Sequence, residues 1–319
     1  MTANTSPAGA TIPFLALVGE RERDWKRVLL VLFGGGALAL LALSLAMFGT
    51  LLAASAIFAG PLDRPLLAAM EVFTSAETDR PLITFLGDLA VVGVSFGVGM
   101  AVFLAVASRV YARPALSFLT AAPRFRWRAV GFGFAVAALL MAASMAIQLS
   151  FATPEGGAPL LRTDAGPADK LGYALGAAVL LYLAALTEEL IYRGWGQQQV
   201  WAITRRIPVI LIASGLLFSL SHGDPNWDAF IIRAAMGIAW GWIVLRTHGL
   251  EFASGMHLGN NLMIVLWIEP VTIRAPEAAP FDLLGLALEF GVLAALVALV
   301  EVARRRPALA RTLGIAAPA

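Results

Sequence analysis

The residues of this sequence best suited to chemistry are a few polar side chains inside long apolar runs. Glu188, Glu189 and Arg193 close a run that begins at Leu171. On a helix Glu189 and Arg193 lie one turn apart with the acid first, the favourable order for an ion pair. Glu188 is turned about 100° away from Glu189. We therefore expect Glu189 to form a structural pair with Arg193, and Glu188 to be free to accept a proton, although an acidic pair at a helix end is also typical of a plain interfacial ion pair.

Two further polar groups follow along the chain. His222 ends an apolar run and precedes the helix-breaking segment 223–226, where a histidine often makes only a favourable contact with the helix dipole. His257 and Asn261 share one face of a later apolar helix. They suit either hydrogen bonds between helices or donation to a developing oxyanion. We assign no role to the third histidine, His248.

Together the three groups supply a carboxylate base, an imidazole and a pair of hydrogen-bond donors. Those are the parts needed for attack of water on an amide carbonyl. The chain has no cysteine, and no serine has an evident partner dyad. The composition therefore excludes thiolate nucleophiles, thiolate metal sites and disulfides.

The elements that must position these groups are membrane helices. Apolar residues make up 59% of the 319 residues and charged residues only 14%, against about 45–50% and about 25% in soluble domains. Basic residues are dispersed between the apolar runs, so a nucleic-acid partner is not expected. The sequence predicts an all-α fold, a polytopic bundle with about eight transmembrane helices. The predicted spans are near residues 28–54, 82–108, 129–150, 171–190, 207–222, 229–247, 253–269 and 283–303.

The basic residues also indicate which way the bundle faces. In this layout 17 of the 23 Lys and Arg residues flank one side of the membrane. Cytoplasmic flanks carry the excess of positive charge. We therefore expect both termini to be cytoplasmic, in an integral multi-pass protein that would lie in the inner membrane if the chain is bacterial.

The order of the three polar groups resembles a known family. Glu188-Glu189-x-x-x-Arg193, Phe218-x-x-x-His222 and His257-x-x-x-Asn261 look like the motifs of the CPBP intramembrane proteases. That family includes the type II CAAX prenyl endopeptidases and bacteriocin-processing or immunity (Abi-like) proteins. The composition and span layout predict one integral bundle with a cytoplasmic tail at 1–27, N-terminal transmembrane helices at 28–150 and a basic tail at 304–319. The resemblance implies that residues 151–303 form a protease core.

The resemblance also implies a role for each matching residue. Glu188 and His222 would activate a water molecule, while His257 and Asn261 would stabilise the oxyanion. The pair formed by Glu189 and Arg193 would support the site. The implied activity is an endopeptidase acting on a membrane-tethered polypeptide next to the lipid bilayer. The alternative from another class is a non-catalytic membrane protein, such as an immunity factor or scaffold.

Metal use is a separate question. Glu188, His222 and His257 are a ligand set that can bind zinc with one open position. The sequence contains no His-Glu-x-x-His helix that would present two ligands on one face. We therefore favour a metal-free glutamate mechanism with no cofactor, with a zinc-dependent metalloprotease as the alternative.

The predicted span ends conflict with a single site. His222 would lie about 22 Å along its helix, toward the face opposite Glu188. The conflict disappears if the fourth helix runs past Arg193, with residues 195–203 as its continuation or as an interfacial connector. We expect Glu188, His222, His257 and Asn261 to surround one cavity.

Overall fold

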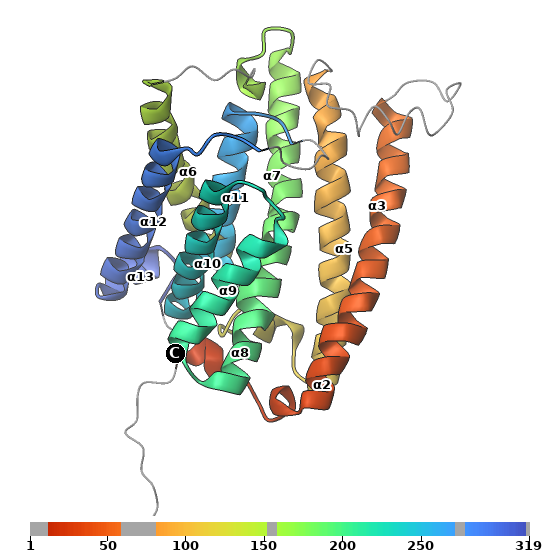
Figure 1. The fold of residues 1–319 in the computed structure, drawn as a ribbon, viewed down its shortest axis with the longest axis vertical. Coiled ribbons are helices and arrows are strands. Elements are labelled where there is room, and N and C mark those ends of the chain that lie inside the picture. Colours follow the sequence, from red (N-terminus) through yellow and green to blue (C-terminus); the bar gives the residue numbers. More distant parts are fainter. Residues whose placement is uncertain (1–11, 59–80, 152–157, 272–277, 317–319) are drawn as a thin grey trace, which may run out of the picture.

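The computed structural model describes residues 12–58, 81–151, 158–271 and 278–316. These residues are almost entirely helical, and the described ranges contain no β-strand beyond an isolated bridge between Thr120 and Gly249. Figure 1 shows the long helices running side by side as one bundle. The all-α membrane bundle expected from the sequence is confirmed.

Each of the eight predicted ranges contains a helix. The first is a continuous segment formed by α2 (Trp25–Leu29), the π-helical turn η2 (Leu30–Gly35) and α3 (Gly36–Phe58). The others are α5 (Phe85–Tyr111), α6 (Trp127–Leu149), α7 (Pro167–Glu189), α9 (Ile207–Ser221), α10 (Trp227–Thr247), α11 (Glu251–Trp267) and α12 (Leu283–Arg304). A short α13 (Pro307–Thr312) follows α12.

Six helical segments in the described ranges are long and apolar enough to cross a membrane. The two that fall short are α9 with 15 residues and α11 with 17. Eight crossings therefore remain a prediction. The side of the membrane that each helix end faces also remains a prediction. Three of the counted basic residues, Arg64, Arg80 and Arg274, lie outside the described residues.

The centre of the bundle is built on a close contact between α6 and α11. A Cβ atom on Gly133 would lie 2.2 Å from the carbonyl oxygen of Phe252, and one on Gly255 would lie 2.1 Å from that of Val130. Only glycine permits backbones to approach this closely. The contact fixes α11, which carries His257 and Asn261, against the rest of the core.

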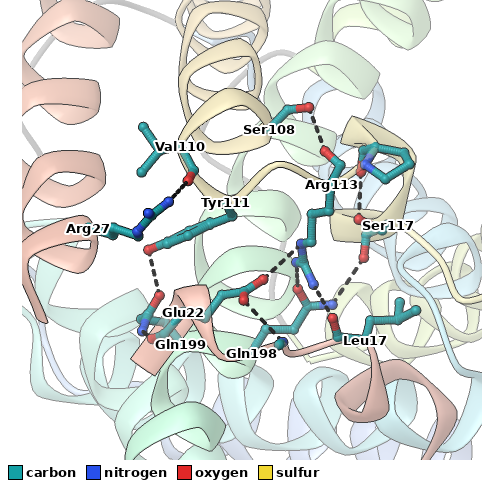
Figure 2. A network of polar contacts seen from close by, with 12 residues as sticks. Leu17, Glu22, Arg27, Ser108, Val110, Tyr111, Arg113, Ser117, Gln198 and Gln199 are labelled. Atoms are coloured by element: carbon teal, nitrogen blue, oxygen red, sulfur yellow. Dashed lines mark hydrogen bonds and ion pairs between the residues drawn. The ribbon is translucent and has the colours of Figure 1, made fainter. Parts of the chain in front are cut away.

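The described part of the N-terminal tail is folded onto the lower end of the bundle in Figure 1. Figure 2 shows Glu22 beside Arg113, with its carboxylate 3.2 Å from the guanidinium Nε. The side chain of Gln199 donates to the backbone oxygen of Glu22 at 2.8 Å and accepts from the Tyr111 hydroxyl at 2.9 Å. Arg113 also donates to the backbone oxygen of Leu17 at 2.8 Å. These bonds join the N-terminal segment, the end of α5 and the helix that follows α7.

Candidate active site

The two adjacent glutamates lie well inside a long helix. After Glu189 the chain makes a π-helical turn, η6 (Leu190–Trp195), and continues as α8 (Gly196–Thr204). The whole helical segment Pro167–Thr204 has 38 residues. The predicted end of the fourth span near residue 190 is therefore wrong, and the expected continuation past Arg193 is confirmed. Glutamines are good helix formers, so the polar residues 197–199 extend the helix and do not end it.

The buried Glu189 side chain makes two polar contacts, one with Arg193 and one with His257. Its Oε1 atom accepts from Arg193 Nη1 at 3.1 Å, as the i, i+4 spacing predicts, and both side chains are fully buried. The same oxygen lies 3.0 Å from Nδ1 of His257. The Arg193 guanidinium also lies over the ring of Phe218, 4.1 Å from its centroid. Glu189 thus fixes the orientation of the His257 ring, a function that its sequence position alone does not reveal.

Glu188 faces two imidazoles. Its Oε2 atom lies 4.0 Å from Nε2 of His222 and 3.7 Å from Nε2 of His257. These separations are longer than the donor–acceptor distance of a direct hydrogen bond, which is about 2.7–3.2 Å. Two atoms 4 Å apart can both lie about 2.8 Å from one water oxygen. The geometry therefore has room for a single water molecule shared by the carboxylate and an imidazole.

The tautomer of His222 follows from its second contact. His222 is the C-cap residue of α9, and its Nδ1 atom lies 2.7 Å from the backbone oxygen of Phe218. A carbonyl oxygen only accepts hydrogen bonds, so Nδ1 carries the proton. In the neutral ring, Nε2 therefore presents a lone pair toward Glu188.

One cavity of about 340 Å³ brings the predicted residues together. Glu188, His222, His257 and Asn261 all line it. Asn260 lines it as well and donates from Nδ2 to Asn261 Oδ1 at 3.1 Å. This bond leaves the Nδ2 donors of Asn261 for another acceptor. The cavity can hold a water and a carbonyl group among a carboxylate, two imidazoles and a side-chain amide.

Residues 170–263 match the family model described as Type II CAAX prenyl endopeptidase Rce1-like. The matched segment runs from α7 into α11 and contains all three polar groups. We call it the Rce1-like segment because of this similarity. The resemblance to the CPBP proteases expected from the motifs is thereby confirmed. No curated protein and no solved structure matches the chain.

The Rce1-like segment supplies two aromatic walls, of which Phe218 belongs to a quoted motif and Trp240 does not. The Trp240 ring packs against His257 with the centroids 4.7 Å apart, and Phe218 contacts His222 at the same separation. Both aromatic residues line the cavity. The two aromatic rings pack directly against the imidazoles and limit the rotation of the imidazole rings. Nothing in the apolar pattern distinguishes Trp240 from a core tryptophan.

Two cavity residues, Ile264 and Glu289, lie outside the Rce1-like segment, and only the second is charged. Glu289 of α12 lines the same cavity as Glu188. An acid inside the apolar run 283–303 is itself a signal, because charged residues within membrane helices are costly and tend to be functional.

In the zinc alternative, the metal would be held by Glu188, His222 and His257. Within the described residues, no set of three or more His, Cys, Asp or Glu side chains is grouped as metal ligands. The metal-free mechanism remains a prediction, with zinc as its alternative.

Proposed function

We propose that this chain is an intramembrane endopeptidase that hydrolyses a peptide bond of a membrane-tethered polypeptide by means of a water activated by Glu188. The observation that carries the proposal is the arrangement of the Glu188 carboxylate opposite two imidazole Nε2 atoms, 3.7 and 4.0 Å away, in one cavity. The Rce1-like match supports a protease of membrane substrates.

The reaction starts with a water held by Glu188 and the lone pair of His222 Nε2. Glu188 removes one proton from the water as its oxygen attacks the substrate carbonyl. The tetrahedral intermediate then collapses, and Glu188 returns the proton to the leaving nitrogen. The second hydrogen of the water stays on the new carboxyl group, so atoms and charges balance.

The oxyanion is stabilised from α11. Asn261 donates through its Nδ2 group, while His257 donates through Nε2. Because Nδ1 of His257 is already directed at Glu189, donation from Nε2 requires the imidazolium form. The Glu189 carboxylate offsets that positive charge, while Glu188 carries the proton taken from the water. Preorganised donors of this kind contribute about 3–4 kcal/mol each to transition-state stabilisation.

The test is cleavage of a library of membrane-tethered peptides, prenylated and unprenylated, by the purified protein in liposomes. We expect cleavage by the wild type that survives a chelator, and none by folded Glu188→Gln. Cleavage abolished by the chelator and restored by zinc would replace the mechanism with a metal-dependent one. A folded wild type that cleaves no peptide would contradict the proposal and favour a binding or immunity role.

A further inference from the structure

A second cavity adjoins the candidate active site. It measures about 220 Å³ and lies among α6, α10, α11 and α12. Four residues line both cavities, namely Ala229, Ile232, Ile264 and Glu289. A peptide bound at Glu188 can therefore extend a side chain past Glu289 into the second cavity.

The walls of the second cavity are mainly apolar. Met141 and Met145 come from α6, Ile264 and Ile268 from the end of α11, and Leu286 from α12. A carboxylate at the junction of an apolar pocket suits a side chain with an aliphatic stem and a cationic head. Lysine and arginine have this form, and they bury the stem while keeping the charge at a polar group.

Glu289 is the carboxylate at that junction. Its Oε2 atom is buried and has no hydrogen-bond partner among the described residues. A carboxylate in such a place is costly unless a cation or several donors meet it.

Apart from Glu188, the proposed base, the other carboxylates and the arginine that line the two cavities already have partners. Asp228 accepts from the backbone N–H of Asp282 at 2.8 Å, and Asp282 accepts from that of Gly285 at 2.8 Å. Arg233, which lines the first cavity, is bonded to Asp224 at 2.7 Å. Among the residues that the structure describes, no lysine or arginine lines the second cavity. Besides Glu188, Glu289 is thus the acid among the described cavity residues that remains available to a ligand.

We propose that Glu289 is a specificity-determining residue that binds a lysine or arginine side chain of the substrate peptide, whose stem occupies the second cavity. The inference rests on the proposed peptidase function. The substrates would be peptides with a basic residue near the scissile bond. The catalytic groups alone do not define this substrate class.

The experiment uses the full-length protein in liposomes and a set of membrane-tethered peptides in which one lysine is scanned through the positions around the scissile bond. Each peptide has a partner with norleucine in place of lysine. The ratio of kcat/KM for the two peptides is measured for the wild type, Glu289→Gln and the control Glu269→Gln. Glu269 is exposed and lines neither cavity.

At one lysine position we expect the wild type and Glu269→Gln to prefer lysine by about tenfold or more. In Glu289→Gln that ratio should fall to about one. A ratio near one at every position in the wild type, or a tenfold preference retained by Glu289→Gln, would overturn the assignment.

A binding measurement separates this inference from the proposed function. Anisotropy of dye-labelled lysine and norleucine peptides is followed on Glu188→Gln protein, with and without Glu289→Gln. Lysine-selective binding that depends on Glu289, without turnover by the wild type, would contradict only the peptidase function. Turnover without lysine selectivity in rate or binding would contradict only the role of Glu289.

Discussion

Replacing Glu189 with glutamine removes the negative charge that Arg193 and His257 share. Glu189 and Arg193 are fully buried, and Nη1 lies 3.1 Å from Oε1. The variant therefore leaves a guanidinium buried without its anion. Removing one partner of a buried ion pair costs about 3–5 kcal/mol of folding free energy. By contrast, Glu188 is 20% exposed and makes no contact with an imidazole shorter than 3.7 Å, so Glu188→Gln should cost less than about 1 kcal/mol.

The assay is unfolding by SDS titration in mixed micelles, followed by circular dichroism. We expect Glu189→Gln to lose about 3–5 kcal/mol, and the double variant Glu189→Gln/Arg193→Met to recover much of it because no charge is left buried. Glu188→Gln is the matched control from the adjacent position. Equal losses in the two single variants, or no recovery in the double variant, would refute the division between a structural and a catalytic glutamate.

Three further variants test the fold. Gly133→Ala should destabilise the bundle in the same assay because its Cβ would lie 2.2 Å from a backbone oxygen of α11. The control Gly131→Ala, which has open space around it, should be neutral or stabilising. Equal effects of the two variants on stability would contradict the close contact between α6 and α11. Burial and two nearby arginines lower the pKa of His248 below 6.5. As the pH drops below about 6.5, the unfolded chain therefore takes up a proton that the folded chain does not. The free energy of unfolding should fall over that pH range. His248→Asn, which tolerates the left-handed backbone there, should flatten that pH dependence, and an unchanged profile would contradict the assignment. Glu22→Gln should speed tryptic cleavage of the N-terminal segment relative to the exposed Glu20→Gln, and equal rates would show that the contact with Arg113 does not hold the segment.

The positions of the helices could be predicted from the sequence because each helix coincides with a long run of apolar residues. Every predicted range contains a helix, and the differences lie at the ends. The largest is at residues 195–204, where Gln198 and Gln199 are polar yet buried. Their side chains bond to the N-terminal segment and to the chain beyond α5. Such tertiary partners, and the π-helical turn before them, leave no pattern in local hydropathy.

The site divides in the same way between local and distant contacts. The Glu189–Arg193 pair follows from i, i+4 spacing within one helix. The bond between His257 and Glu189 joins residues 68 positions apart, and no spacing rule predicts it. Glu289 did carry a signal, an acid within an apolar run, but its place beside the other groups depends on how α12 packs against α10.

The most direct test of the central claim is the single-turnover rate of one membrane-tethered peptide with Glu188→Gln, compared with the wild type, after both have been shown to be equally folded. General-base catalysis typically contributes about 10²- to 10⁴-fold. We expect the rate to fall by at least about 100-fold with unchanged peptide binding. A folded Glu188→Gln protein that cleaves within about tenfold of the wild-type rate would contradict it.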